Sequence, residues 1–330
     1  MDSDRHITDL GLKNSSAKLL PKDTILLSSR ATVGEISITL TECSTNQGFQ
    51  SLIIKNDVDN DFIYYLISTI RNEFLRRSSG STFLEISKNE ISKIPINIPD
   101  LFEQNKISNF FSAIDNKIEI LEKKYKYYQE FKKYLMQRIF SDQDDKLRFD
   151  FKGEWERKSI GEIFNITRGE VIAKTLIKEV SDDEYCYPVF SSQTTNNGIM
   201  GYYNNFDFEG EYITWTTDGA NAGKTFYRNG KFKCSNVCGV LEPKEDYVGF
   251  ANHFIAEYLG SITYKYVSYV GNPKLMNNTM SKIKIKYPPL DEQNKISELF
   301  NKLNFNIVSL EQQIELMQKF KKGLLQQMFV

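Results

Sequence analysis

The chain has 330 residues, of which 40 % are hydrophobic and 26 % are charged. This is ordinary globular composition and enough length for two domains. The formal net charge is −1, which argues against indiscriminate binding of DNA through bulk positive charge. DNA affinity would need local patches or a partner. No segment approaches the roughly 18 consecutive apolar residues of a membrane helix, and the polar N-terminus is unlike a signal peptide. The composition therefore predicts a cytoplasmic protein.

The first predicted globular segment contains short strands, tight turns and one helix. Residues 25–29 and 36–38 are expected to be strands, separated by a turn at residues 30–34. Apolar side chains at helical spacing then predict a helix that runs through Ile63, Leu66, Ile67, Ile70 and Phe74. We expect this segment to span residues 1–102.

A long helix is predicted over residues 103–140. Its apolar residues alternate at spacings of three and four, which is the seam of a coiled coil. A helix of about 38 residues is about 57 Å long and must bury that stripe against a partner. Asp100 followed by Glu103 resembles a capping box at its start. The seam residues are Ile107, Phe111, Ile114, Ile118, Leu121 and Tyr125.

The polar residues 141–154 are expected to be a linker, and a second globular segment is predicted over residues 155–291. Residues 212–217 read as a strand that ends at Asp218-Gly219. Residues 225–228, followed by Asn229-Gly230, carry the strongest hairpin signal in the chain. Helical spacing is present in residues 250–262.

The last segment, residues 292–330, is predicted to be a second long helix with the same kind of seam. Pro288-Pro289 precedes it. Each seam has one break, Lys132 in the first helix and Lys321 in the second. These lysines either tune register and oligomer state or reach solvent along their stems. The seam residues are Ile296, Phe300, Leu303, Ile307, Leu310 and Ile314.

The two halves of the chain are copies of one unit. The six residues 103–108, Glu-Gln-Asn-Lys-Ile-Ser, return at 292–297, an offset of 189, and further matches follow along both helices. The cheapest partner for each helix is therefore the other helix. At this offset residue 1 corresponds to Phe190, so the first copy has no counterpart to about 35 residues of the second. A natural truncation, a choice of start site and completion by another chain remain open.

Motifs for catalysis are missing. The sequence contains no phosphate-binding loop and no dinucleotide-binding glycine motif. Its two histidines leave little scope for acid–base work, and we expect His253 to be packed or at the surface. The four cysteines form no Cys-x-x-Cys pair, so no metal site is predicted and free thiols are expected.

Polar loops between the predicted strands are the candidates for contact with DNA. Amide side chains can bond adenine edges, and hydroxyl and cationic groups can bond phosphates. The candidates in the first segment are Ser28, Ser29, Arg30, Thr32, Arg76, Arg77, Ser79, Ser81 and Thr82. In the second segment they are Gln193, Thr194, Asn196, Asn197, Thr216, Thr217, Asn221, Lys224, Tyr269, Asn272 and Lys274.

The order of these motifs, present twice, resembles the specificity subunit of type I restriction–modification systems. The resemblance covers nearly the whole chain and rests on the loop 26–34, the junctions 94–96 and 287–290, the paired Glu-Gln-x-Lys-Ile helix starts and the segment 155–163. It implies an α+β fold with two target-recognition domains, joined by two long helices in an antiparallel coiled coil with pseudo-twofold symmetry.

The resemblance also implies a function. Each domain would read one half of a bipartite site in double-stranded DNA, and the helices would set the spacer and dock two modification (methyltransferase) subunits. S-adenosylmethionine, ATP and magnesium would be held by the modification subunits and by restriction (motor–nuclease) subunits, with no cofactor and no catalysis on this chain. A second copy of this chain, which would complete the first domain by self-association, is a further implied partner. The alternative is a non-catalytic coiled-coil scaffold with globular binding heads.

Overall fold

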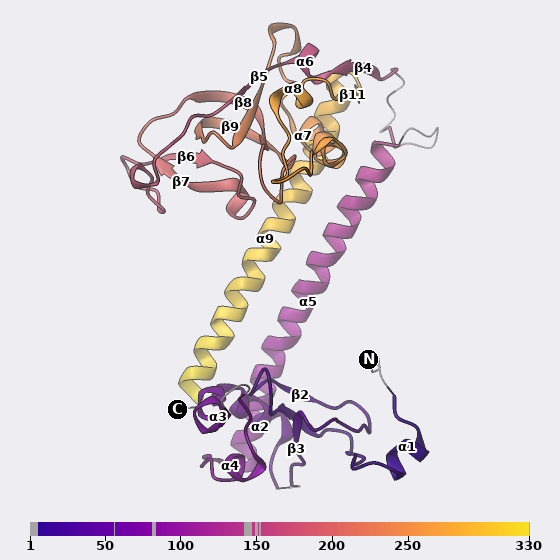
Figure 1. Cartoon of the computed structure of the whole chain (residues 1–330), viewed down its shortest axis with the longest axis vertical. Coiled ribbons are helices and arrows are strands. Elements are labelled where there is room, and N and C mark those ends of the chain that lie inside the picture. The colour runs from indigo at the N-terminus through magenta and orange to yellow at the C-terminus, as the bar shows by residue number, and fades with distance from the viewer. Residues whose placement is uncertain are drawn as a thin grey trace. The chain divides into compact units, whose positions relative to one another are not determined.

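The computed structural model describes residues 6–55, 57–80, 84–141, 147–148, 151 and 153–329. The chain divides into two compact units. Unit 1 is Met1–Lys124 with Leu310–Val330, and unit 2 is Tyr125–Ser309, so the division falls within both long helices. Figure 1 labels the elements of each unit. Neither long helix, nor any other helix in the described ranges, is long and apolar enough to cross a membrane.

Unit 1 contains a three-stranded antiparallel sheet in the order β2-β1-β3. Ile25 of β1 lies opposite Ile38 of β2 and Leu52 of β3. Ile25 and Leu27 are fully buried against helix α2, which begins where Asp59 accepts a hydrogen bond from the Phe62 N–H. The elements are α1 (Asp9–Lys13), β1 (Ile25–Ser28), β2 (Ile36–Ile38), β3 (Phe49–Leu52), α2 (Asn60–Thr69), α3 (Arg71–Arg77), α4 (Lys88–Ser92) and α5 (Leu101–Ile139).

The single helix predicted through Phe74 was wrong, because the structure breaks it at Ile70 into α2 and α3. The hydroxyls of Ser68 and Thr69 bond back to carbonyls in the last turn of α2, an interaction that competes with a continuing helix. The break turns Phe74 into the core, where it is 2 % exposed.

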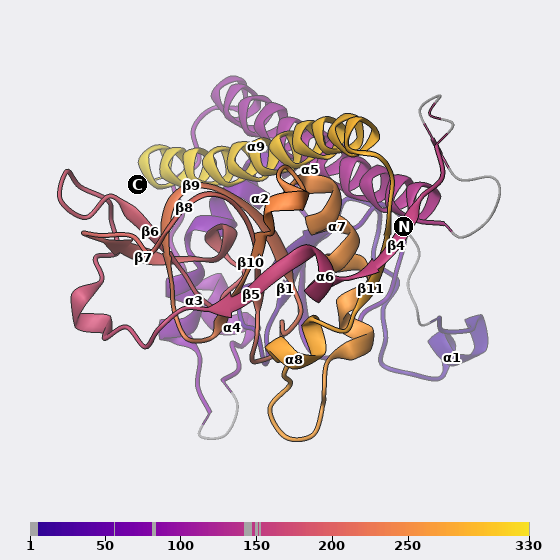
Figure 2. The ribbon, with the colours of Figure 1, turned by 90° about the horizontal axis from the view of Figure 1, so that it is seen from above.

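Unit 2 is built around a six-stranded sheet in the order β5-β10-β8-β9-β6-β7, with a separate β11-β4 pair. Figures 1 and 2 show α7 beside α9, and the core cluster joins α7, α9 and the sheet. The strands are β4 (Glu156–Ser159), β5 (Phe164–Arg168), β6 (Tyr187–Phe190), β7 (Ile199–Tyr203), β8 (Phe208–Thr216), β9 (Thr225–Cys234), β10 (Cys238–Pro243) and β11 (Lys284–Tyr287). The helices are α6 (Ile160–Ile163), η1 (Lys174–Leu176), η2 (Asn196–Gly198), η3 (Glu245–Tyr247), α7 (His253–Ile262), η4 (Thr263–Tyr266), α8 (Asn277–Met280) and α9 (Leu290–Met328).

The hairpin predicted at Asn229-Gly230 was also wrong, because both residues lie inside the ten-residue strand β9. Gly230 pairs with Gly210 of β8, and both glycines have positive φ angles. Two facing glycines let both strands take this backbone conformation at the same rung. Pairing with β8 therefore overrides the local turn preference.

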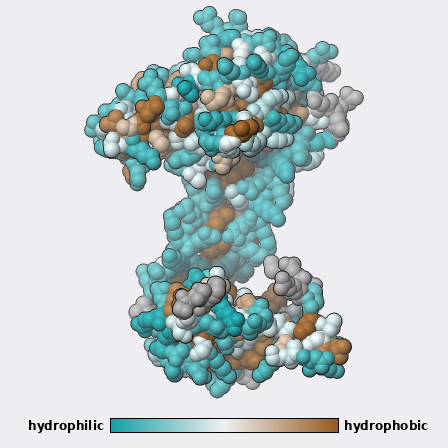
Figure 3. All heavy atoms as spheres, in the orientation of Figure 1, coloured by the Kyte–Doolittle hydropathy of each residue, from teal (hydrophilic) through white to brown (hydrophobic). Residues whose placement is uncertain are grey.

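The long helices form an antiparallel coiled coil, and each unit contains one end of it. In unit 1, Phe111 of α5 packs on Phe329, just beyond the end of α9, with 6.0 Å between ring centroids. In unit 2, Phe140, just beyond the end of α5, stacks on Phe300 near the start of α9 at 6.1 Å. Leu121 and Leu310 are both buried within unit 1. In Figure 3, hydrophilic residues cover most of the visible surface of the two helices.

The predicted seam residues are buried or half-buried throughout. Ile107, Tyr125, Ile307 and Ile314 are half-buried, and the other eight are at most 8 % exposed. The two-helix coiled coil expected from the seam pattern, and the antiparallel arrangement that the resemblance implies, are thereby confirmed.

The two lysines that interrupt the seam take part in equivalent polar clusters. In unit 2 the Lys132 ammonium donates to Glu257 at 2.6 Å and to the Asn304 amide oxygen at 2.8 Å. In unit 1 the Lys321 ammonium donates to Asp115 at 2.5 Å. Asp115 lies 189 residues before Asn304, so both lysines meet the same position of the facing helix. The solvent-reaching alternative is therefore wrong.

A buried glutamine at the start of each long helix holds the neighbouring globular fold. Gln104 accepts a hydrogen bond from the Asp59 N–H and donates to the Pro99 carbonyl, both at 2.8 Å. Gln293 accepts from the Asn252 amide at 3.0 Å and donates to the Pro288 carbonyl at 2.9 Å. Asp59 and Asn252 cap α2 and α7. The repeated Glu-Gln-Asn-Lys-Ile-Ser motif thus fixes each helix start to a cap in the globular part of its unit.

Candidate nucleic-acid interface

A tight loop follows strand β1 in unit 1. The Ser28 hydroxyl donates to the Thr32 carbonyl at 2.5 Å and accepts from the Glu35 N–H at 2.9 Å. The Gly34 N–H donates to the Ser28 carbonyl at 3.0 Å, and Gly34 has φ +90°. A side chain is strained at that angle, and a Cβ there would meet Arg71 at 2.7 Å.

The loop after β8 in unit 2 uses the same scheme. The Thr216 hydroxyl donates to the Asn221 carbonyl and accepts from the Lys224 N–H at 3.2 Å. The Gly223 N–H donates to the Thr216 carbonyl at 2.8 Å, and Gly223 has φ +88°. Because the buried hydroxyl fixes the loop from beneath, the side chains at its tip are free to face a ligand.

Each loop is tied to a second loop by an ion pair, and the sign of the pair is reversed between the units. In unit 1, Arg30 lies 3.2 Å from Glu85. In unit 2, Asp218 lies 3.6 Å from Lys274. Each ion pair also coincides with an isolated antiparallel β-bridge, between Arg30 and Glu85 in unit 1 and between Asp218 and Lys274 in unit 2. The two pairs therefore occupy equivalent positions in the two units. Exposed ion pairs contribute only about 0–1 kcal/mol, so either cation can exchange its partner for a phosphate at low cost.

The second loops are closed by matching backbone bonds. Ser79 and Glu85 exchange N–H···O bonds at 3.0 and 2.9 Å, and Ser268 and Lys274 exchange two at 2.9 Å. At the tip of the unit 2 loop, Tyr269 is 68 % exposed. An exposed aromatic ring in a polar loop is suited to stacking or groove contact.

The neighbouring arginines differ in their surroundings. Arg76 is bonded to Glu73 at 2.7 Å, but its side chain is 72 % exposed. The Arg77 side chain is 28 % exposed and lies 3.6 Å from Glu73 and 3.8 Å from Glu90. Arg76 is therefore the better placed of the two to meet a phosphate, whereas Arg77 also ties α3 to α4.

A buried arginine supports the amide-rich loop at residues 191–198. The Arg228 guanidinium lies 3.6 Å from the Phe190 ring centroid and donates to the Thr214 hydroxyl at 3.0 Å. Burial lowers the pKa of Arg228 to about 10. A Cβ on Gly198 would come 2.9 Å from this guanidinium, so the loop lies directly against it.

At the tip of the same loop, Asn196 and Asn197 have φ angles of 49° and 51° and are exposed. Both amides therefore face solvent from a backbone conformation that asparagine tolerates better than most residues.

Comparison with known protein families identifies the family of this chain. The family model described as type I restriction modification DNA specificity domain matches residues 2–127 and 152–317. This chain belongs to that family. The two matched segments fall one in each half of the repeat.

Several relatives agree with this membership. A putative type I specificity subunit of Mycoplasma pneumoniae is 32% identical over 234 residues, which cover 69% of this chain and 92% of that protein. The specificity subunit of the type I restriction enzyme MpnII from the same species is 38% identical over 170 residues, half of each chain. The crystal structure of a type I S subunit from M. genitalium shares the fold, with TM-score 0.74, 18% identity and coverage of 95% of this chain and 84% of that one.

In this specificity-family chain, the predicted DNA-contacting residues divide by exposure. Four hydroxyl residues, Ser28, Ser29, Thr216 and Thr217, are buried at 7 % exposure or less. Ser81 and Thr82 lie outside the described residues. Exposed or half-exposed residues are Arg30, Thr32, Arg76, Arg77, Ser79, Gln193, Thr194, Asn196, Asn197, Asn221, Lys224, Tyr269, Asn272 and Lys274.

Sequence reasoning missed Glu85, Asp218 and Arg228 as parts of this interface. The repeat offset of 189 contains a signal for Glu85, because it aligns Glu85 with Lys274, a residue of opposite charge, but it aligns Asp218 with Ser29 and gives no signal there. Arg228 gives no such signal, since its burial depends on the rings that the sheet brings around it. His253 is half-buried beside Tyr227 at 4.5 Å, as expected for a packed residue.

The described residues contain no group of three His, Cys, Asp or Glu side chains that could hold a metal ion. The four cysteines are free, with Cys234 and Cys238 adjacent in the core at 3.4 Å between sulfurs.

Proposed function

We propose that this chain is the sequence-recognition subunit of a type I restriction–modification complex, and that each unit reads one half of a bipartite DNA site. The observation that carries the proposal is the family match in two segments, one in each copy of an internal repeat. A pseudo-twofold protein that presents two equivalent loop sets is complementary to a duplex read at two separated half-sites.

The exposed loop residues supply the chemistry of recognition. The amides of Asn196 and Asn197 can pair with adenine edges, and Arg76 suits phosphate. The reversed ion pairs give the two units different surface charge on the same loop geometry. Two units built alike would thus read different half-sites.

The long helices act as the spacer and as the docking surface for modification subunits. Tyr127 and Tyr134 lie one heptad apart on α5, outside the seam, and are 63% and 54% exposed. Exposed aromatic side chains are typical of protein interfaces. The modification and restriction subunits would supply S-adenosylmethionine, ATP and magnesium, and this chain would perform no catalysis.

The first test is domain exchange. Replacing residues 155–290 by the corresponding segment of another specificity subunit, followed by sequencing of methylated sites in cells, is expected to change one half-site and leave the other. A change in both half-sites would contradict independent reading. The absence of any methylation that depends on the chain would favour the scaffold alternative.

The second test concerns the spacer. Deleting residues 120–126 and 309–315 removes one heptad at equivalent positions and keeps both lysine clusters. The helices shorten by about 10 Å at about 1.5 Å per residue, which corresponds to about three base pairs at about 3.4 Å each. We expect a shorter spacer in the methylated sequence. An intact complex that methylates with the original spacer would contradict the spacer role.

A further inference from the structure

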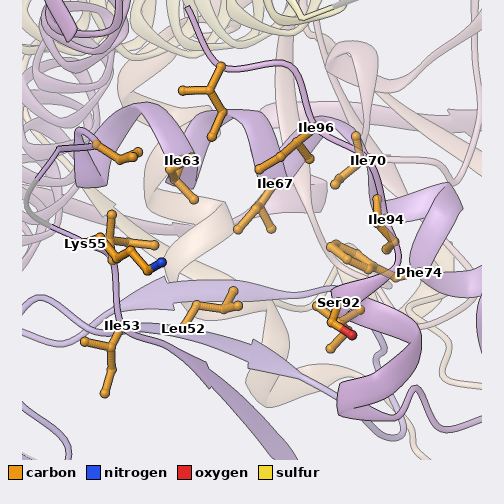
Figure 4. A pocket seen from close by; sticks show the side chains of 14 residues that line it. Leu52, Ile53, Lys55, Ile63, Ile67, Ile70, Phe74, Ser92, Ile94 and Ile96 are labelled. Atoms are coloured by element: carbon orange, nitrogen blue, oxygen red, sulfur yellow. The ribbon is translucent and has the colours of Figure 1, made fainter. Parts of the chain in front are cut away.

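Unit 1 has an apolar groove whose counterpart in unit 2 is filled. The groove encloses about 430 Å³ between the end of β3, helices α2 and α3, and the segment 91–98. Figure 4 shows Leu52 and Ile53 on one side of it and Ile63, Ile67, Ile94 and Ile96 around the rest. Ile53 is 62% exposed and Ile96 is 41% exposed. So much exposed aliphatic surface in one place indicates a binding site.

In unit 2 the segment β4-α6-β5 fills the equivalent place. Strand β4 pairs with β11, with Lys158 opposite Ile285, and β5 pairs with β10, with Ile166 opposite Leu241. Between the strands, α6 turns Ile160 into the core, where it is fully buried. One short segment therefore covers two strand edges and closes the core.

The repeat offset of 189 identifies the counterparts of these contacts in unit 1. Leu241 corresponds to Leu52, and Ile285 to Ile96. Leu241 and Ile285 are fully buried, whereas Leu52 and Ile96 line the open groove. The sheets correspond as well, because Ser28 pairs with Phe49 as Thr216 pairs with Cys238. Phe49 and Cys238 are related by the offset of 189, and Ser28 and Thr216 by one residue less. The groove is thus the same structural position without its strand–turn–strand segment.

The polar contacts of that segment also have counterparts. In unit 2 the Gly161 N–H donates to the Ser281 carbonyl at 2.9 Å, and the Lys244 ammonium donates to the Gly161 carbonyl at 2.6 Å. The residues at the same offset in unit 1 are Ser92 and Lys55, and both line the groove. The groove therefore retains the groups that bind a helical turn as well as the apolar surface.

We propose that the groove binds a strand–helical turn–strand segment of the class formed by residues 156–168. Its first strand would pair with residues 95–98 and its second with the outer edge of β3, which is β-strand addition at an open edge. No described residue of unit 1 occupies that place. The proposal does not rest on DNA reading, and its test uses no DNA.

A second copy of this chain is disfavoured as the donor. In each copy Ile160 and Ile163 are fully buried, and Phe164 is 1 % exposed, within unit 2. Donating the segment would expose all three and open the same groove in the donor. A strand–helical turn–strand segment that is not already packed into a domain of its own would gain apolar burial in the groove without exposing apolar residues elsewhere.

The test uses the full chain and a fluorescent synthetic peptide with the sequence of residues 153–170. Fluorescence anisotropy is expected to show saturable binding at one peptide per chain. The Ile96→Asp variant should bind at least about tenfold more weakly, because an unpaired carboxylate would be buried. The matched control Leu40→Asp, at another exposed apolar residue of unit 1 (64% exposed), should bind as the parent does.

A peptide with Ile160→Asp and Ile163→Asp should fail to bind the parent chain, which tests the groove without any change to the protein. Several outcomes would overturn the proposal. They are no binding of the parent peptide, binding that Ile96→Asp leaves unchanged, and light scattering that shows a dimer whose mass Ile96→Asp halves. The last result would assign the groove to a second copy.

Discussion

The lysine cluster in unit 2 offers a quantitative test of how the coiled coil is held in register. Lys132 interrupts the apolar seam, and its ammonium bonds Glu257 of α7 and Asn304 of α9. Asn304 also donates to Glu257 at 2.9 Å. Replacing Lys132 by Met keeps an unbranched side chain that is one atom shorter and improves the seam, but leaves the Glu257 carboxylate without its counterion.

The expected cost follows from burial. The side chains of Lys132 and Glu257 are 22% and 19% exposed. Removing one partner of a fully buried pair costs about 3–5 kcal/mol. Partial solvent access and the gain of an apolar seam residue reduce this, so Lys132→Met should destabilise unit 2 by about 1–3 kcal/mol. For a unit of this size the loss corresponds to about 2–12 °C in melting temperature.

Tryptophan fluorescence is the matching assay, because both tryptophans of the chain, Trp155 and Trp215, lie in unit 2. The control Lys126→Met removes a lysine that is 77% exposed on the same helix, and should change stability by less than about 0.5 kcal/mol. In a double-mutant cycle, Glu257→Gln should restore much of the loss caused by Lys132→Met. A coupling energy below about 0.3 kcal/mol would refute the register role.

Three further outcomes are expected. Arg76→Gln should weaken binding about equally on all DNA sequences and lower the salt dependence of binding by about one phosphate contact. Arg77→Gln should weaken binding in the same way but by a smaller amount. Base-specific changes in affinity, measured by competition, would contradict this. Asp218→Asn should free Lys274 and steepen the salt dependence of binding, and an unchanged slope in a salt titration would count against a phosphate role for that lysine. Burial lowers the pKa of His253, so the unfolded state takes up a proton first as pH falls through about 6.5; the stability of unit 2 should therefore decline across this window, and His253→Gln should flatten the decline in urea titrations.

The helix pair was predictable from the sequence because its periodicity and its repeat are both local patterns. The seam runs through residues that the structure buries. At the start of the first helix, the Asp100 carboxylate accepts a hydrogen bond from the Glu103 N–H at 2.9 Å, as expected of a helix cap. The hairpin at Asn229-Gly230 was not predictable, because the partner strand that overrides it is set by pairing with Gly210. Local turn chemistry is decisive only where no strand is available to pair.

The loops were predictable as segments but not residue by residue. Hydroxyl residues in a polar loop look alike in sequence, yet the Ser28 hydroxyl is used to close the turn and Thr32 is exposed. The difference depends on which side chain lies under the turn, which is fixed only when Gly34 adopts its positive φ angle. Exposure in the folded loop is therefore the quantity that sequence reasoning lacked.

The two units show how one scaffold can keep its geometry while its surface changes. The contacts that build the loops, a buried hydroxyl beneath the turn and a glycine with positive φ, are the same in both. The charges at the loop junction are reversed, as Arg30 with Glu85 becomes Asp218 with Lys274. Reversing an exposed pair changes stability little, but it moves a cation from one loop to the other. Drift at such positions would alter what each unit binds without disturbing how it folds.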